Sequence, residues 1–202
     1  ASGSHAFQTL VNQSAASVRD PETGVTILER RRAKTIVDGN QKGAEGDAKR
    51  VAKLVAGGAQ PPITALGSGS DYTVFIDHLG IASLNLGFGG ESDTAGVYHS
   101  AYDSFDHYSR FGDPGFAYGV VLAQTAGRVV LRAADADVLP LRFGDFADAV
   151  AEYAEEVHKL ADSMRESTDA QHRMLDDNLF KLAADPTKKS LPPARDAAVP
   201  VL

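Results

Sequence analysis

One short stretch of the chain, residues 67–103, restricts the possible folds more than any other. Residues 67–70 (Gly-Ser-Gly-Ser) predict a tight turn, followed by a short helix that ends near Leu79. The next residues, 81–88, form an apolar run that is typical of a buried strand. A glycine-rich acidic loop, 89–96, then leads to His99. A turn, a helix, a strand and a histidine-bearing loop in this order predict an α/β domain.

Periodic apolar residues predict further elements on both sides of this stretch. A helical stripe begins near His5 and ends before Asp20-Pro21, because the residue before a proline is pushed out of helical geometry. The other expected elements are a helix at 26–37, a mainly surface connection at 39–62 with a weak helical stretch at 48–55, a short strand at 63–66, a helical turn from Ser100, and a buried helix that starts at Asp113-Pro114 and ends at Ala134.

Bulk properties exclude several classes of function. The net charge of −7 argues against nucleic-acid binding, and the one dense basic run, Arg30 to Arg32, is offset by Glu29. No apolar run approaches the roughly 20 residues that a membrane helix needs. The absence of cysteine excludes disulfides, thiolate chemistry and cysteine-bound zinc. A chain of 202 residues is long enough for one good core or for a domain with a smaller appendage.

The C-terminal third has a different character. Its apolar residues alternate spacings of three and four over three heptads, which predicts a long amphipathic helix; they are Phe143, Phe146, Val150, Tyr153, Val157, Leu160 and Met164. We expect a domain boundary near Pro140. The proline-rich tail after Asp185 is expected to lack a packed partner within this chain.

His99 is the strongest single candidate for chemistry. It follows a glycine-rich loop beyond a predicted buried strand, and ligands of α/β proteins gather at such strand ends. Tyr98 beside it offers a phenol that could hydrogen-bond a substrate group or an oxyanion. A surface histidine that caps a turn is the simpler reading of His99 when it is considered alone.

Three motifs together favour a functional role for His99 over a structural one. They are Gly-Ser-Gly-Ser-Asp at 67–71, Leu-Gly-Ile-Ala-Ser at 79–83, and Tyr-His-Ser-Ala-Tyr-Asp at 98–103. In this order they resemble the C-terminal part of a two-zinc exopeptidase of the glutamate carboxypeptidase and transferrin receptor-like family. The resemblance covers residues 4 to about 164 and is densest from 65 to 142.

The resemblance implies a fold and a set of roles. Residues 1–140 would be the C-terminal part of a three-layer α/β/α catalytic domain, and residues 141–202 would begin a helical dimerisation region. His99 would bind one of the two zinc ions of the intact enzyme. Tyr98 would lie in the substrate cleft and help to polarise the scissile carbonyl. The glycine turn would line the same cleft through Ser68, Gly69 and Ser70.

Two departures from the family pattern matter. Carboxypeptidases that cleave acidic peptides place arginines just after Ala-Ser, where this chain has Leu-Asn-Leu-Gly at 84–87, so a preference for acidic substrates is in doubt. The family's His-x-Asp pair, Glu-Glu pair and further Asp lie upstream of the region seen here, and no His-x-Asp precedes His99. A site with two zinc ions needs roughly five ligands and a carboxylate base, so we expect this chain alone to be inactive and to bind zinc weakly.

Other candidate residues have structural readings. Glu155-Glu156 is the only Glu-Glu pair, but it lies inside the predicted amphipathic helix and is expected to be a solvated face that pairs with Lys159. His158 and His172 are expected at the surface. His78 and His107 are expected to be structural.

Two alternatives of other classes stay open. The chain could be a non-catalytic, transferrin receptor-like interaction module that homodimerises through the C-terminal helices, or, with little support, a phosphate-binding protein that uses the glycine turn. The turn lacks the P-loop lysine and the Rossmann glycine spacing. The sequence leaves the compartment open; relatives are often exported or membrane-anchored through an upstream segment.

Overall fold

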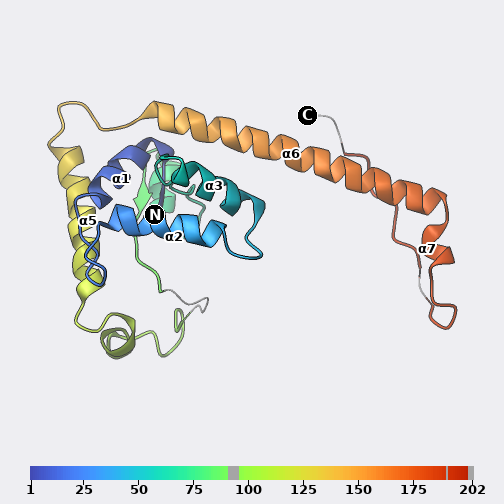
Figure 1. The fold of residues 1–202 in the computed structure, drawn as a ribbon, viewed down its shortest axis with the longest axis horizontal. Coiled ribbons are helices and arrows are strands. Elements are labelled where there is room, and N and C mark those ends of the chain that lie inside the picture. The colour runs from blue at the N-terminus through green and yellow to red at the C-terminus, as the bar shows by residue number, and fades with distance from the viewer. Residues whose placement is uncertain (91–95, 190, 200–202) are drawn as a thin grey trace. The chain divides into compact units, whose positions relative to one another are not determined.

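The computed structural model describes residues 1–90, 96–189 and 191–199. The described chain is mainly helical, with one small sheet (Figure 1). Its elements are β1 (Ser2–Gly3), η1 (His5–Phe7), α1 (Gln8–Ala15), α2 (Ile27–Gly39), α3 (Gly46–Ala56), η2 (Val74–His78), β2 (Leu84–Asn85), α4 (Phe105–His107), η3 (Tyr108–Gly112), α5 (Ala117–Ala134), α6 (Phe143–Asp176) and α7 (Leu179–Leu182). Most of the predicted acidic loop, together with the end of the C-terminal tail, lies outside the described residues.

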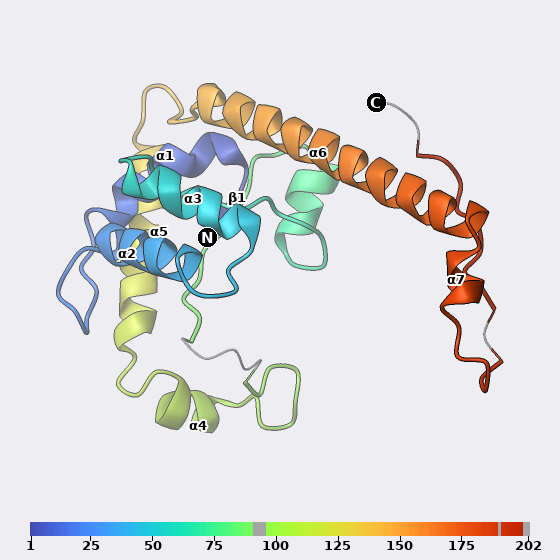
Figure 2. The same ribbon diagram turned by 45° about the vertical axis from the view of Figure 1, so that its right-hand side comes forward.

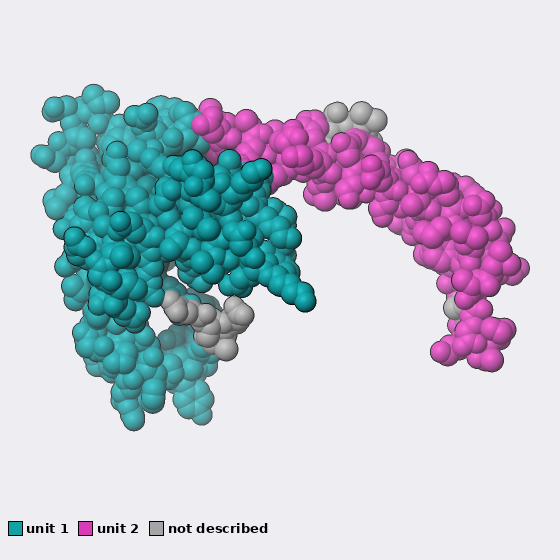
Figure 3. Space-filling model, in the orientation of Figure 1, with its two compact units in different colours: residues 1–146 teal, residues 147–202 magenta. Residues whose placement is uncertain are grey.

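The chain divides into two compact units, Ala1–Phe146 and Ala147–Leu202 (Figure 3). The division falls inside α6, four residues after its start. None of the helices in the described part is both long and apolar enough to cross a bilayer.

The core of the first unit is built from α1, α2, α3 and α5. The predicted stripe on the first helix is confirmed, because Leu10, Val11 and Ala15 are all buried. The helix predicted at 26–37 is confirmed as α2. It begins with a capping box, in which the Thr26 hydroxyl accepts from the Glu29 amide and the Glu29 carboxylate accepts from the Thr26 amide.

The weak helical stretch predicted at 48–55 is present as the longer helix α3, and most of the 39–62 connection is exposed as expected. Helix α3 packs closely against α2, with Ala52 and Val55 fully buried. Gly39 allows this approach, since a Cβ placed on it would lie 2.3 Å from the carbonyl oxygen of Ala48. The many small and charged residues of this segment hid a helix with one narrow apolar face.

The sheet is smaller than the sequence suggests. Strands β1 and β2 pair antiparallel, with Ser2 opposite Asn85 and Gly3 opposite Leu84. The strand predicted at 63–66 contributes one parallel bridge, between Thr64 and Ser2. The strand predicted at 81–88 shrinks to two residues and is not buried in the described chain. Helices with a small sheet are compatible with the α/β class, while the three-layer domain is a proposal taken up below.

Helix α5 begins three residues later than its sequence signals predict, at Ala117. The Asp113 carboxylate still caps it, accepting hydrogen bonds from the amides of Tyr118 (3.2 Å) and Gly119 (2.8 Å). The expectation that this helix is buried on most sides is wrong for the described chain. One face is buried, through Val121, Thr125 and Val129, and the opposite face is exposed.

The second unit consists of most of α6, α7 and the tail. The apolar stripe predicted for α6 lies on a continuous helix, and its members are exposed by 41–70%. The tail was expected to lack a packed partner. Two polar contacts join it to α6: Arg195 pairs with Asp176 at 2.7 Å, and the carbonyl of Asp196 lies 2.9 Å from Nε2 of His172.

Candidate functional site

His99 lies in a turn whose backbone is held by local hydrogen bonds. Its own φ is +61°, a left-handed conformation that is uncommon for residues other than glycine. The amide of Ser100 donates to the carbonyl of Val97, and the amide of Asp103 donates to the carbonyl of Ser100. The Asp103 carboxylate accepts from the His99 amide at 3.4 Å. The predicted helical turn at Ser100 is therefore a non-helical turn, and the first helix after it is α4.

The side chain of His99 is presented outward together with that of Tyr98. Their rings stack with centroids 3.8 Å apart, and Tyr98 is 72% exposed. The neighbouring aromatics Tyr102 and Phe105 are also exposed. Among the described residues, no group of three or more histidine, aspartate or glutamate side chains is placed to hold a metal ion. Within the described part of the chain, His99 is therefore not surrounded by a complete set of metal ligands.

The glycine turn is also exposed, and its amides already have partners. The amides of Gly69 and Ser70 both donate to the hydroxyl of Thr73, at 3.0 and 3.2 Å. Gly69 has a φ of +93°, which explains why glycine is used there. A phosphate cradle needs such amides free to face an anion. The hydrogen bonds to Thr73 therefore count against the phosphate-binding alternative.

The structure does not bring the glycine turn and His99 together. Figure 2 draws the short helix that follows the glycine turn, η2, apart from α4, the first helix after His99. No hydrogen bond or ring contact joins the two motifs within the described ranges. The roles predicted for Ser68, Gly69, Ser70, Tyr98 and His99 remain predictions.

The Glu-Glu pair in α6 behaves as expected of a solvated helix face. Glu155 forms an exposed ion pair with Lys159, one helical turn away, at 3.3 Å. His158 lines an open apolar groove on the same helix with Val150, Tyr153, Ala154 and Val157, and this groove has a volume of about 420 Å³. This pair does not stand in for a metal-binding Glu-Glu motif.

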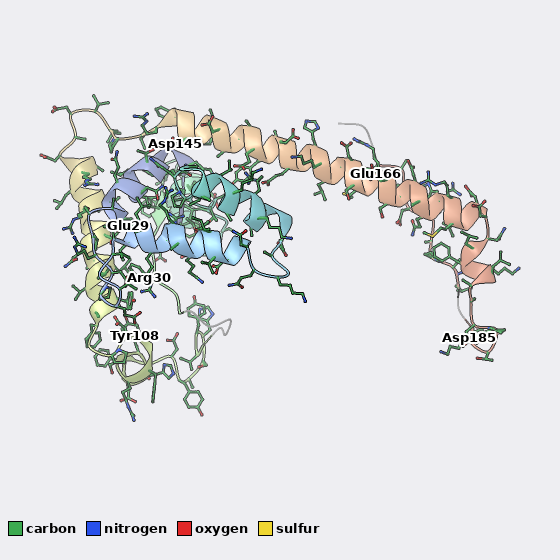
Figure 4. The ribbon with its side chains drawn as sticks, viewed as in Figure 1. Glu29, Arg30, Tyr108, Asp145, Glu166 and Asp185 are labelled. Carbon is green, nitrogen blue, oxygen red and sulfur yellow. The ribbon has the colours of Figure 1, made fainter. Side chains whose placement is uncertain are left out.

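The most developed polar cluster in the first unit joins Asp20, Arg30 and Tyr118, and the sequence analysis did not predict it. Arg30, labelled in Figure 4, donates to the Asp20 carboxylate at 2.6 Å and to the phenol oxygen of Tyr118 at 2.5 Å. The Asp20 carboxylate also accepts from the amide and hydroxyl of Thr23. Burial would raise the pKa of Asp20, but the Thr23 amide, the Arg30 guanidinium and the Thr23 hydroxyl lower it to about 2.

The two neighbouring arginines also form hydrogen bonds within the first unit, in their case to backbone carbonyls. Arg31 donates to the carbonyl of Pro62, and Arg32 donates to the carbonyls of Val55 and Ala59. The sequence shows these residues as a basic run, whereas the structure uses their guanidinium groups to bind backbone carbonyls. The i, i+1, i+2 spacing of the run gave no sign of this role.

Asp113 forms a second polar cluster at the start of α5. Its carboxylate accepts from the Tyr108 phenol at 3.2 Å, in addition to the two amides of the cap. Burial acts to raise the pKa of Asp113, but the amides of Gly119 and Tyr118, with the Tyr108 phenol, hold it below its ordinary value. The Asp-Pro signal predicted the cap, and nothing in the sequence indicated the partnership with Tyr108.

Comparison with known proteins supports the resemblance. No family model matches the chain. It is 35% identical over 115 residues to the aminopeptidase NAALADL1 of Rattus norvegicus, an overlap of 54% of this chain and 15% of that protein. The chain is homologous to glutamate carboxypeptidase-like peptidases. A probable glutamate carboxypeptidase of Arthroderma benhamiae is 39% identical over 99 residues, or 48% of this chain and 14% of the relative. The probable glutamate carboxypeptidase LAMP1 of Arabidopsis thaliana is 37% identical over 91 residues, or 45% and 13%.

This homology confirms the family suspected from the three motifs. The chain spans about one seventh of the length of these glutamate carboxypeptidase-like relatives. These relatives include both an aminopeptidase and probable carboxypeptidases.

Proposed function

We propose that this chain is part of a metallo-exopeptidase with two zinc ions, which hydrolyses peptide bonds near a chain end. The observation that supports this most is the similarity of about half the chain to glutamate carboxypeptidase-like peptidases. In this proposal residues 1–140 complete a three-layer α/β/α catalytic domain. His99 binds one zinc ion, Tyr98 contacts the scissile carbonyl, and the glycine turn lines the substrate cleft.

The geometry is consistent with a site that needs further residues from elsewhere. His99 and Tyr98 are both exposed, and the described residues contain no group of three or more candidate ligands around them. Zinc sites need about four ligands per ion, from histidine, carboxylate or water. The remaining ligands and the carboxylate base would come from segments outside this chain. The chain by itself is then inactive.

The isolated chain offers the first test of this proposal. Because only one ligand is present, the purified 202-residue chain should retain less than one zinc ion after dialysis, measured by plasma mass spectrometry. It should not hydrolyse aminoacyl-anilides or dipeptides when zinc is added. Tight stoichiometric zinc together with hydrolysis would contradict the claim that the site is incomplete.

A longer protein offers the second part of the same test. The reading frame upstream of Ala1 should encode a His-x-Asp pair, a Glu-Glu pair before a glycine, and a further Asp. In a protein that includes them, His99→Ala should remove one zinc ion and lower kcat/KM at least about 100-fold, because a ligand is lost. His78→Ala changes another exposed histidine and should leave zinc content and activity unchanged. Equal behaviour of the two variants would remove His99 from the metal site.

A second candidate function has its own observation. The α6 stripe stays exposed along three heptads, and an exposed apolar seam of this kind commonly marks a protein interface. The chain could therefore act as a transferrin receptor-like module that homodimerises through residues 141–202. This reading does not require the zinc site to be complete.

The interface proposal predicts a clear effect of one charge. Val157→Glu places a carboxylate in the middle of the stripe and should convert an oligomer into monomers or aggregates, measured by light scattering during gel filtration. Ala151→Glu adds the same charge to an exposed position outside the stripe and should leave the molar mass unchanged. A Val157→Glu variant with the parent's oligomeric state would exclude the stripe as the interface.

A further inference from the structure

Tyr118 is the residue that connects the histidine-bearing segment, residues 96–116, to the helices of the first unit. Its backbone amide donates to Asp113 at 3.2 Å, at the end of that segment. Its phenol oxygen lies 3.4 Å from the carboxylate of Asp20, a residue 98 positions earlier in the sequence, and accepts from Arg30 of α2. One residue therefore takes part in both polar clusters of the unit.

The first cluster fixes the segment at its C-terminal end. Asp113 accepts from the Tyr108 phenol and donates its own amide to the Tyr108 carbonyl at 2.9 Å. Gly112 makes this fold possible, since a Cβ placed there would lie 2.9 Å from the Tyr108 ring. The carboxylate thus holds η3 against the start of α5, and this contact is buried around Asp113.

Local hydrogen bonds then run from Tyr108 back to the histidine. The amide of Tyr108 donates to the carbonyl of Ser104, and the amide of Ser104 donates to the carbonyl of Tyr102. Asp103 in turn bonds the amide of His99. A series of short-range hydrogen bonds therefore links the backbone around His99 to the attachment of the segment at Asp113.

The second cluster supplies the anchor on the helices. The Asp20 side chain is 1% exposed, and its charge is paired with Arg30 at 2.6 Å. The Tyr118 phenol contacts this pair, and the Arg30 guanidinium lies 5.9 Å from the centre of the Tyr118 ring. The same ring packs against Phe88, with the two ring centres 5.5 Å apart. Hydrogen bonds to a charged, desolvated pair are stronger than neutral ones.

Two residues of the segment have a strained, left-handed backbone conformation. Phe116 has a φ of +59° and His99 has a φ of +61°, which are unfavourable for side chains of this size. Such conformations persist when the surrounding contacts determine them, and they gather at functional sites. The Phe116 ring contacts both Phe105 (5.9 Å) and Tyr108 (6.1 Å).

We propose that Tyr118 is a positioning residue for His99: its amide and phenol together lock the 96–116 segment onto the Asp20–Arg30 pair. The proposal rests on the proposed function for the role of His99, whereas the lock itself rests on the contacts above. Tyr118 touches neither metal nor substrate in this scheme. It acts by restricting where the histidine can lie.

Tyr118→Phe tests the lock because it removes only the hydroxyl group. The ring, its contact with Phe88 and the backbone bond to Asp113 are kept. In the full 202-residue chain, amide hydrogen exchange at residues 98–112 should become about tenfold faster, which corresponds to the loss of one charge-assisted bond. Exchange in α2 and α3 should remain unchanged. A merely structural role would instead speed exchange in all these helices together, and that result would overturn the proposal.

Two controls sharpen the reading. Tyr102→Phe removes the hydroxyl group of an exposed tyrosine in the same segment and should leave amide hydrogen exchange at 98–112 unchanged. Asp113→Asn weakens the other end of the lock and should also speed exchange in the segment, without affecting α2 and α3. If Tyr118→Phe leaves the segment as protected as in the parent, the lock does not exist.

Zinc affinity separates this proposal from the proposed function. In a longer protein with the upstream ligands, Tyr118→Phe should weaken zinc binding about tenfold, while Tyr102→Phe should not. If His99→Ala has no effect on zinc but Tyr118→Phe still loosens the segment, the proposed function fails and the lock stands. If His99 binds zinc and Tyr118→Phe changes neither exchange nor affinity, the positioning role fails alone.

Discussion

Replacing Asp20 with alanine should lower the free energy of unfolding of the first unit by about 3 kcal/mol, because it leaves the Arg30 guanidinium without its buried partner. The same change removes the acceptor for the Thr23 amide and hydroxyl, so the loop between α1 and α2 loses its internal support. Urea unfolding followed by circular dichroism at 222 nm would measure the effect, since the unit is mainly helical.

Glu22→Ala is the matched control for this change. Glu22 also pairs with Arg30, at 3.3 Å, but its side chain is 65% exposed. Exposed pairs contribute little, so Glu22→Ala should change stability by no more than about 0.5 kcal/mol. Equal losses in the two variants would show that burial of Asp20 does not strengthen its ion pair.

Acid should reproduce the effect of the Asp20 substitution in the parent chain. The pKa of Asp20 is about 2 in the folded state, below the value of about 3.9 for an unfolded aspartate. The folded state therefore favours the ionised carboxylate. Its stabilisation is complete above pH 4 and is lost as the pH falls toward 2. Asp20→Ala should show a shallower loss over this range, apart from the contributions of other carboxylates.

Gly39→Ala should destabilise the first unit by about 2–3 kcal/mol, although alanine is the better helix former. The added methyl group would lie 2.3 Å from the Ala48 carbonyl oxygen and 2.4 Å from the Ala52 side chain. Helices α2 and α3 would have to separate, which exposes the buried Val55. Thermal and urea unfolding of the purified chain would report the loss.

Gly46→Ala provides the comparison for Gly39. Gly46 is the first residue of α3, and a Cβ there meets no atom within 4 Å. Alanine at this position should be neutral or stabilising, because it restricts the unfolded chain. If both substitutions stabilise the chain, then α2 and α3 do not pack as closely as the structure shows.

Local signals in the sequence predicted the helices well and the sheet poorly. The helix expected from Thr26 and the stripe on the first helix are short-range patterns, and both are confirmed. The short helix predicted to end near Leu79 is followed by Gly80 with a left-handed φ of +66°, as is typical after a helix end. These features depend on residues within one or two turns of each other, so composition and spacing are sufficient to find them.

The failures share a different cause. The apolar run at 81–88 predicted a buried strand, but a strand is buried only where other elements cover it, and the described chain covers little of this one. Helix α3 was underestimated because its packing depends on Gly39, seven residues before it begins. Contacts between residues that are distant in the sequence cannot be recognised from the local spacing of apolar residues.

The candidate site shows the same difference between short-range patterns and long-range contacts. The glycine-rich loop and the motif pointed to His99 and Tyr98, and the motif resemblance identified the family. The residues of the polar cluster, Asp20, Arg30 and Tyr118, lie up to 98 positions apart and carry no shared pattern. In the sequence, Arg30 appears only as part of a short basic run offset by Glu29.

The Tyr118–Asp20 contact also bears on how the first unit forms during synthesis. Closing a loop of 98 residues has an entropic cost that local turns do not have, so this contact should form late. The bonds from Thr9 to Asp145 and from Ser14 to Arg132 span still longer stretches. Helix α1 therefore leaves the ribosome roughly a hundred residues before its partner α5. Until α5 emerges, the face of α1 that α5 covers is unshielded, and chaperone binding or aggregation competes with folding.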